Sequence, residues 1–88
     1  MITRTISLSR SVGDAVAVDI LEPDSNRDGF VIYNPTGVLF VKLSKYASPT
    51  NFTYRLSANT TLEHAGYTGY VSAIKQNGIS DVMITTLL

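Results

Sequence analysis

The sequence predicts an all-β protein: a single-domain antiparallel β-sandwich (jelly-roll-like), or a small barrel, of about eight short strands. Apolar and polar side chains alternate with a period of two along most of the chain. Turn-forming residues recur about every eight to twelve positions, and no segment shows the period of an amphipathic helix. Because 88 residues is the size of one domain, we expect a single sandwich over residues 1–88.

The first third of the chain contains three segments that are typical of strands. Residues 2–8 alternate apolar or long side chains with serine and threonine, which indicates a half-buried strand. Residues 12–14 break this pattern, and residues 15–21 then place valines 16 and 18 and isoleucine 20 on one face. Residues 30–33 form a short apolar run, as in a central strand.

The rest of the chain predicts five more strands, separated by turns with recognisable chemistry. The Asn-Pro-Thr-Gly sequence at 34–37 presets a turn through its proline and closes it with glycine. The Asn-Gly sequence at 77–78 is a hairpin signal. The expected strands are residues 38–43, 51–56, 60–64, 70–75 and 80–87.

The composition limits the classes of partner and reaction. Seven basic residues balance seven acidic ones, so we expect no nucleic-acid and no membrane partner, since both need a concentrated positive field. The absence of cysteine removes disulfides and thiolate chemistry. With 44% hydrophobic but only 16% charged residues, a small domain has little interior for its apolar side chains, so we expect a homo-oligomer.

One loop contains part of a calcium-binding signature. Asp24, Asn26, Asp28 and Gly29 match the first half of an EF-hand loop, in which oxygens at alternate positions hold the ion. The position that should supply the final bidentate carboxylate is Pro35, and the flanking segments are strands. We therefore interpret the loop as a turn and expect no metal, with these residues as a weak calcium-binding alternative.

No arrangement of side chains indicates catalysis. His64 is the only histidine, and Glu63 should point to the opposite face of the same strand. The chain has no nucleophile elbow and no glycine-rich phosphate loop. We expect no enzyme activity, no catalytic residue and no cofactor.

Aromatic side chains give a second functional alternative. Tyr46, Tyr67 and Tyr70 could form a stacking platform for sugars, because tyrosine combines an apolar ring with a polar hydroxyl. The competing interpretation places them in the core, at its rim, or in a subunit interface.

Four segments in the middle and at the end of the chain form a combined pattern. They are Asn-Pro-Thr-Gly at 34–37, Leu-Phe-Val-Lys-Leu at 39–43, Thr-Asn-Phe-Thr-Tyr-Arg-Leu at 50–56 and Tyr-Thr-Gly-Tyr-Val-Ser-Ala-Ile at 67–74. Through this pattern the chain, from Tyr33 onward, resembles a group of small β-rich proteins encoded by tailed bacteriophages. The resemblance covers about two-thirds of the chain and rests on packing and turn residues. Related chains often carry Pro-Gly where this chain has Ser-Ala-Asn at 57–59, which leaves the shape of that turn open.

The resemblance implies a structural protein of the virion, made in the host cytoplasm. The expected role is capsid decoration through contacts with capsid or other virion proteins; the alternative is a carbohydrate-binding module of a head fibre or tail. Apolar segments near the chain ends are the expected contact regions, because apolar ends of a small domain need cover. The candidate interface residues are Ile2, Ile6, Leu8, Val82, Ile84 and Leu87.

Overall fold

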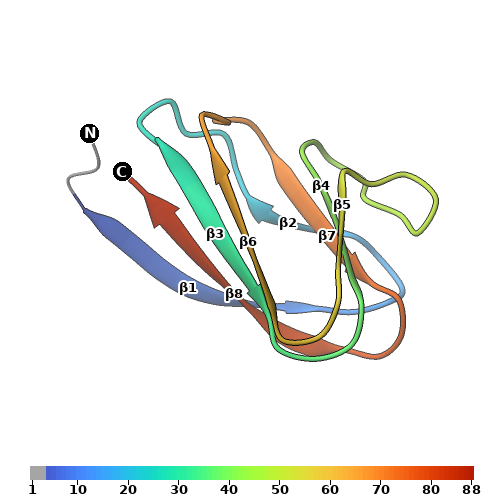
Figure 1. Cartoon of the computed structure of the whole chain (residues 1–88). Helices are drawn as coiled ribbons and strands as arrows, with labels where there is room; N and C mark the ends of the chain where they lie inside the picture. The colour runs from blue at the N-terminus through green and yellow to red at the C-terminus, as the bar shows by residue number, and fades with distance from the viewer. Residues whose placement is uncertain (1–3) are drawn as a thin grey trace.

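A computed structural model describes residues 4–88 as two four-stranded antiparallel sheets packed face to face (Figure 1). The predicted all-β sandwich is confirmed, and the barrel alternative is wrong because the two sheets stay separate. No helix in this part of the chain is long and apolar enough to cross a membrane. The strands are β1 (Thr5–Val12), β2 (Val18–Leu21), β3 (Gly29–Asn34), β4 (Leu39–Lys42), β5 (Tyr54–Leu56), β6 (Thr60–Ala65), β7 (Val71–Lys75) and β8 (Ser80–Leu87).

The strand order is that of a jelly roll. One sheet has the order β1-β8-β3-β6 and the other the order β2-β7-β4-β5. Of the strands that follow one another in the chain, only β4 and β5 pair side by side; every other connection crosses from one sheet to the other. The fold therefore depends on contacts between distant segments, such as β1 with β8.

The hydrophobic core lies between the sheets and follows the predicted alternation. In β8, Val82, Ile84 and Thr86 point inward and are buried, while Met83 between them is exposed on the outer face. The core consists of Val12, Ile20, Leu21, Phe30, Ile32, Leu39, Val41, Leu56, Val71, Ala73, Val82 and Ile84.

Two local expectations are wrong. The chain does not break before Val12, which is the last residue of β1, and β2 begins only at Val18. Val16 therefore lies in the connecting loop, with 72% of its surface exposed, and not on a strand face. The Asn-Gly turn forms with a positive φ of 76° at Gly78, but it joins β7 and β8 of different sheets and is not a hairpin.

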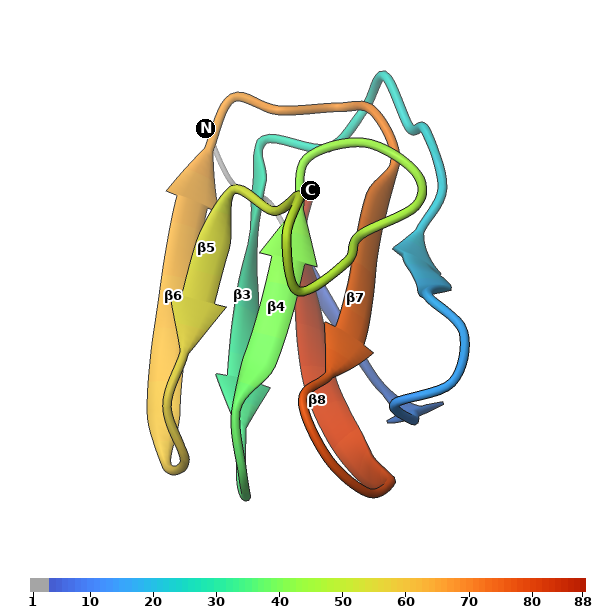
Figure 2. The same cartoon turned by 90° about the vertical axis from the view of Figure 1, so that its right-hand side faces the viewer.

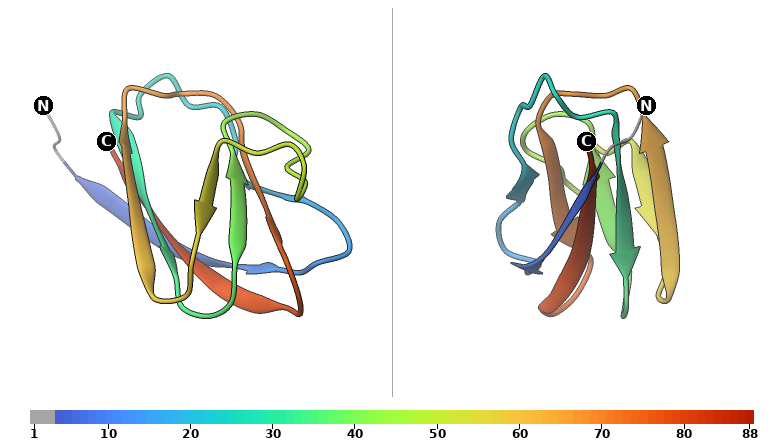
Figure 3. Two further views of the ribbon diagram at one scale, coloured as in Figure 1. Left: turned by 45° about the vertical axis from the view of Figure 1, so that its right-hand side comes forward. Right: turned by 90° about the vertical axis from the view of Figure 1, so that its left-hand side faces the viewer.

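The connections gather at the two ends of the sandwich (Figures 1, 2 and 3). We call the end with four connections the turn end, and the end with three connections, which include the long β4–β5 loop, the loop end. The turn end comprises residues 13–17, 35–38, 57–59 and 76–79. The loop end comprises residues 22–28, 43–53 and 66–70.

Candidate binding surfaces

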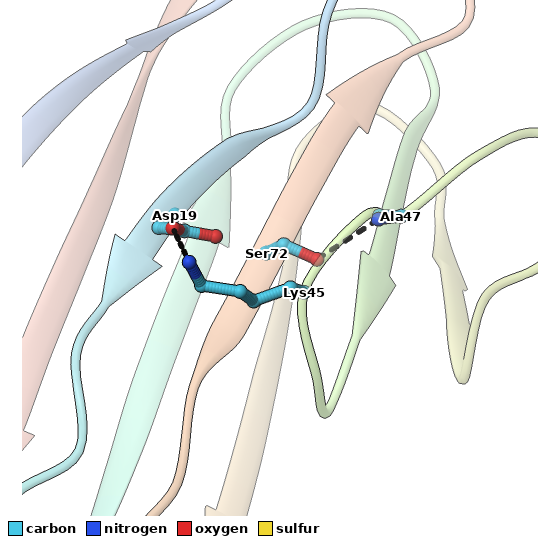
Figure 4. Close-up of polar contacts among 4 residues, drawn as sticks. All are labelled: Asp19, Lys45, Ala47 and Ser72. Carbon is cyan, nitrogen blue, oxygen red and sulfur yellow. Dashed lines mark hydrogen bonds and ion pairs between the residues drawn. The ribbon is translucent and has the colours of Figure 1, made fainter.

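The long loop between β4 and β5 folds back over the outer face of the β2-β7-β4-β5 sheet. The main-chain N–H of Ala47 donates a hydrogen bond of 3.0 Å to the buried Oγ of Ser72, on β7 (Figure 4). Phe52 packs on Phe40, with ring centroids 4.8 Å apart. Phe40, Ala47 and Ile74 form a second, smaller apolar cluster outside the main core. This sheet is therefore covered on its outer side by the chain itself.

The same loop places a lysine between two tyrosines. The Nζ of Lys45 lies 3.6 Å from a carboxylate oxygen of Asp19 on β2 (Figure 4). It lies 4.5 Å from the ring centroid of Tyr70 and 5.9 Å from that of Tyr46. Tyr70 first, and then Asp19, raise the pKa of Lys45 above its ordinary value. We call Asp19, Lys45, Tyr46 and Tyr70 the Lys45 patch.

Tyr46 has an unusual backbone conformation for its type. Its φ is 66°, in the left-handed region that side chains with a Cβ atom rarely adopt. Tyr46 is nevertheless 77% exposed, so burial of its side chain does not compensate this strain. Strained, exposed aromatic residues recur at binding sites, which makes Tyr46 the strongest single candidate for ligand contact.

Tyr67 has a different role from the other two candidate tyrosines. It is half-buried against the main core, and its hydroxyl donates a 2.9 Å hydrogen bond to the main-chain oxygen of Leu43. Its ring lies edge-on to His64, with centroids 6.3 Å apart. The structure thus brings Tyr46 and Tyr70 together around Lys45 and uses Tyr67 to hold the start of the loop.

The acidic loop at residues 22–28 forms a turn held by main-chain contacts. The carboxylate of Asp24 accepts a 2.9 Å hydrogen bond from the N–H of Asn26, which is an Asx turn. The N–H of Asp24 donates to Thr68 O, and the N–H of Asp28 donates to Leu87 O. Within residues 4–88, no three histidine, aspartate or glutamate side chains group as metal ligands do.

Close approach between strands explains the glycine of this loop. A Cβ atom on Gly29 would lie 2.6 Å from the main-chain oxygen of His64 on β6, which is too close for any other residue. Gly29 is not among the glycines with positive φ, the conformation that a sharp calcium-loop turn requires. The Asp-Gly pair therefore reflects packing of β3 against β6.

No local pattern in the sequence points to Arg27, the residue that organises this loop. Arg27 is buried, and its guanidinium donates to three main-chain oxygens: Glu22 at 3.0 Å, Tyr67 at 3.1 Å and Gly69 at 2.7 Å. It also lies 5.9 Å from the ring centroid of Phe30. Burial lowers its pKa, but a guanidinium stays charged in proteins. Arg27 ties the β2–β3 loop to the β6–β7 loop.

A second buried cation lies at the turn end, at Lys75 on β7. Its Nζ donates to the side-chain oxygen of Asn34 at 2.9 Å and to the main-chain oxygen of Thr36. Burial lowers the pKa of Lys75 below its ordinary value. The sequence offers one sign that Lys75 is buried: it is a charged residue at the end of a largely apolar strand.

Asn34 is fully buried and distributes hydrogen bonds to two neighbouring turns. Its amide nitrogen donates to the main-chain oxygens of Gly37, Leu56 and Ser57, at 3.0 to 3.2 Å. It thereby joins the predicted Asn-Pro-Thr-Gly turn to the β5–β6 turn. These contacts are structural, and they hold the turn end together.

His64 points inward from β6, opposite to Glu63, as the alternation predicts. Its ring stacks on Phe30, with centroids 5.6 Å apart, and its Nδ1 lies 3.1 Å from the hydroxyl of Tyr54. A hollow of about 510 Å³ opens beside it. Glu63 also lines this hollow, but it belongs to the outer face, so the two side chains do not form an acid–base pair. The lining residues are Phe30, Val31, Glu63, His64, Ala65 and Leu87.

The candidate interface residues are placed very differently. Val82 and Ile84 have 0% exposure and belong to the core, so they have no surface to offer a partner and leave the candidate interface. Leu8 and Leu87 are half-buried, whereas Ile6 is 46% exposed. Ile2 lies outside the described residues.

The outer face of the β1-β8-β3-β6 sheet is open. No loop within residues 4–88 crosses it (Figure 3, right). Strand register places Tyr33 beside Met83 and Val31 beside Thr85 in the middle of this face, and serines of β1 along one side. We call Val31, Tyr33, Met83 and Leu87 the outer apolar strip; all four are half-buried or exposed.

Comparison with known proteins adds nothing to these observations: no protein-family model, curated protein or solved structure matches the chain. The resemblance to bacteriophage proteins therefore stays a prediction.

Proposed function

We propose that this protein is a non-enzymatic structural component of a tailed-bacteriophage virion, acting in capsid decoration through protein–protein contacts. The observation that supports this most is the contrast between the two sheets. One is covered by its own loop, while the other leaves the outer apolar strip open in a domain with few charges. Apolar side chains left open on an otherwise polar face are a common feature of protein interfaces.

Two general arguments add support. Jelly rolls are common in viral capsid proteins, although this is an analogy of fold and not of site. Many copies on a symmetric shell also let weak contacts act together, so that a small neutral domain needs no deep pocket to bind firmly. The partner in this proposal is a capsid or other virion protein, and the protein is located on the particle.

Binding to particles tests this proposal. Purified protein is mixed with particles of a virus that encodes it, grown without this gene, and co-sedimentation is measured. We expect saturable binding that falls at least about tenfold with Met83→Glu, because a buried charge in an apolar contact is costly. Ile79→Glu is the matched control, since Ile79 is an exposed apolar residue on a turn away from the strip. Failure of the folded wild-type protein to bind would overturn the proposal.

A second candidate function is carbohydrate binding at the Lys45 patch, in adhesion. The strained and exposed Tyr46, beside Lys45 and Tyr70, favours it. Tyr46→Gly removes the ring without harming the fold. Glycine adopts a positive φ without strain, so the variant should be as stable as wild type or more stable. A glycan-binding signal lost in Tyr46→Gly and in Tyr70→Ala, but kept in Phe52→Leu, would support this function. Binding unchanged in all three variants would exclude the patch.

A further inference from the structure

The two sheets have four edge strands, and they differ in how well they are protected against pairing with another chain. β5 has only 3 residues, and β2 has 4 residues with an irregular register at Asp19 and Leu21. β6 carries the charged Glu63 in its middle. Short length, irregularities and charge all discourage edge pairing. β1 has 8 residues, no proline and no irregularity in its register, and its one charged residue, Arg10, lies toward its C-terminal end.

The hydrogen-bond pattern shows which groups of β1 are directed outward. Arg4 and Leu88 exchange both main-chain hydrogen bonds, at 3.3 and 2.9 Å. Because antiparallel ladders alternate, the even-numbered residues of β1 bond to β8 and the odd-numbered ones direct N–H and C=O away from it. The outward groups therefore belong to Thr5, Ser7, Ser9 and Ser11.

The side chains of β1 also leave apolar surface on the inner face. Even-numbered residues point inward, and the adjoining strand of the opposite sheet, β2, has only 4 residues. Ile6 is 46% exposed and Leu8 is half-buried, although both lie on the core side of their strand. An additional strand beside β1 would cover both side chains and satisfy the outward main-chain groups.

We propose that β1 pairs antiparallel with β1 of a second copy, about a twofold axis at Leu8. In this register Ser7 lies opposite Ser9 of the partner subunit, and Thr5 opposite Ser11 of the partner subunit. All four outward-facing residues then exchange hydrogen bonds, and the two four-stranded sheets join into one continuous sheet. The outer face forms a ladder of serine and threonine, which pair well across strands.

A second copy suits this edge better than an unrelated strand. Leu8 meets Leu8 of the partner subunit on the axis, and Ile6 lies opposite Arg10 of the partner subunit, so no like charges face each other. The protein has zero net charge, so repulsion between copies is weak. This interface deepens the proposed assembly function, on which its biological role rests.

Cysteine cross-linking tests the register directly, because the protein has no cysteine of its own. In this register Leu8 forms a non-hydrogen-bonded pair on the axis, with Cα atoms about 4.5 Å apart. That distance suits a disulfide. We expect Leu8→Cys to form a disulfide-linked dimer under mild oxidation. Ile6→Cys is the matched control and should stay uncrosslinked, since its two copies would lie about 13 Å apart.

A proline substitution tests the edge in protein without introduced cysteines. Ser9→Pro removes an outward N–H and spares the ladder with β8, so the fold should survive. We expect wild type to be a dimer by light scattering and Ser9→Pro to be a monomer, while Thr61→Pro on the β6 edge remains dimeric. A monomeric wild type, or a Ser9→Pro variant that is still a dimer, would overturn the inference.

The co-sedimentation assay separates this inference from the proposed function. A dimeric wild type whose Leu8→Cys variant cross-links, but which does not bind particles, overturns the function and supports the interface. A wild-type monomer that binds particles overturns the interface and supports the function. If a strand of another virion protein pairs with β1 in place of the second copy, mixing Leu8→Cys protein with particles should abolish the cross-link. That result would overturn the second copy as the partner of β1.

Discussion

The connections at the two ends of the sandwich are held together by different side chains. Each end holds a buried cation whose hydrogen bonds go to oxygens of the protein's own turns and loops. At the loop end, Arg27 alone donates to three main-chain oxygens from two loops. At the turn end, Lys75 reaches two oxygens, and Asn34 carries the network on to three more.

The difference follows from the shapes of the two cations. A guanidinium is a planar fork with five donors, so one side chain can satisfy oxygens that lie in different directions. An ammonium is a compact point charge with three donors, so Lys75 needs the amide of Asn34 to extend its reach. Arginine suits the longer, irregular loops, and the Lys75–Asn34 pair suits two tight turns that lie close together.

The largest effect is expected from removing the arginine. Arg27→Met should lower the free energy of unfolding by about 3 to 5 kcal/mol, because a buried donor is lost and three main-chain oxygens lose their partner. Arg27→Lys should recover part of this loss, since it restores the charge without the fork. Urea unfolding measures both, and a loss of less than about 1 kcal/mol for Arg27→Met would contradict the role of Arg27.

A smaller effect is expected at the turn end. Lys75→Met should cost about 2 kcal/mol, because only the oxygens of Asn34 and Thr36 lose a donor. We expect strong coupling between Lys75 and Asn34. Asn34→Ala should lower the free energy of unfolding much less in the Lys75→Met background than in wild type. Additive losses in the double mutant would show that the two side chains act independently.

One neutral hydrogen bond, from the N–H of Ala47 to the Oγ of Ser72, is among the contacts that hold the loop over the β2-β7-β4-β5 sheet. Ser72→Ala should cost about 1 kcal/mol, because the N–H of Ala47 loses its acceptor. Thr50→Ala, in the exposed part of the same loop, is the control and should change stability little. Equal losses in urea unfolding for the two variants would contradict the importance of the Ser72 contact.

The smallest effect is a pH dependence from Lys75. Burial lowers its pKa below the ordinary 10.5, so the unfolded chain holds this proton to a higher pH than the folded protein. Unfolding then takes up a proton just below pH 10.5, and stability rises with pH in that window. We expect wild type to gain stability relative to Lys75→Met as the pH rises toward 10.5. Lys45, whose raised pKa has the opposite effect, is present in both proteins and cancels. A relative loss of stability would contradict the sign.

The strands were predictable because their signal is local. Alternation in β8 separated its inward from its outward residues, although Val82 and Ile84 were expected at an interface and lie in the core. The turn at 34–37 formed as its proline and glycine predict. The candidate site was predictable only in part. Tyr46 and Tyr70 were both candidates, but their meeting at Lys45 depends on how the β4–β5 loop folds over β2 and β7.

By itself, the sequence determined the all-β class, the existence of eight strands and most of their buried faces, because a period of two shows at short range. Only the tertiary structure decided that β7 and β8 lie in different sheets and that β1 is an open edge. It also decided that Arg27 and Lys75 are buried. Strand pairing and the burial of a charge both depend on main-chain and side-chain groups from segments far apart in the chain. A local sequence pattern does not show which distant segments will meet.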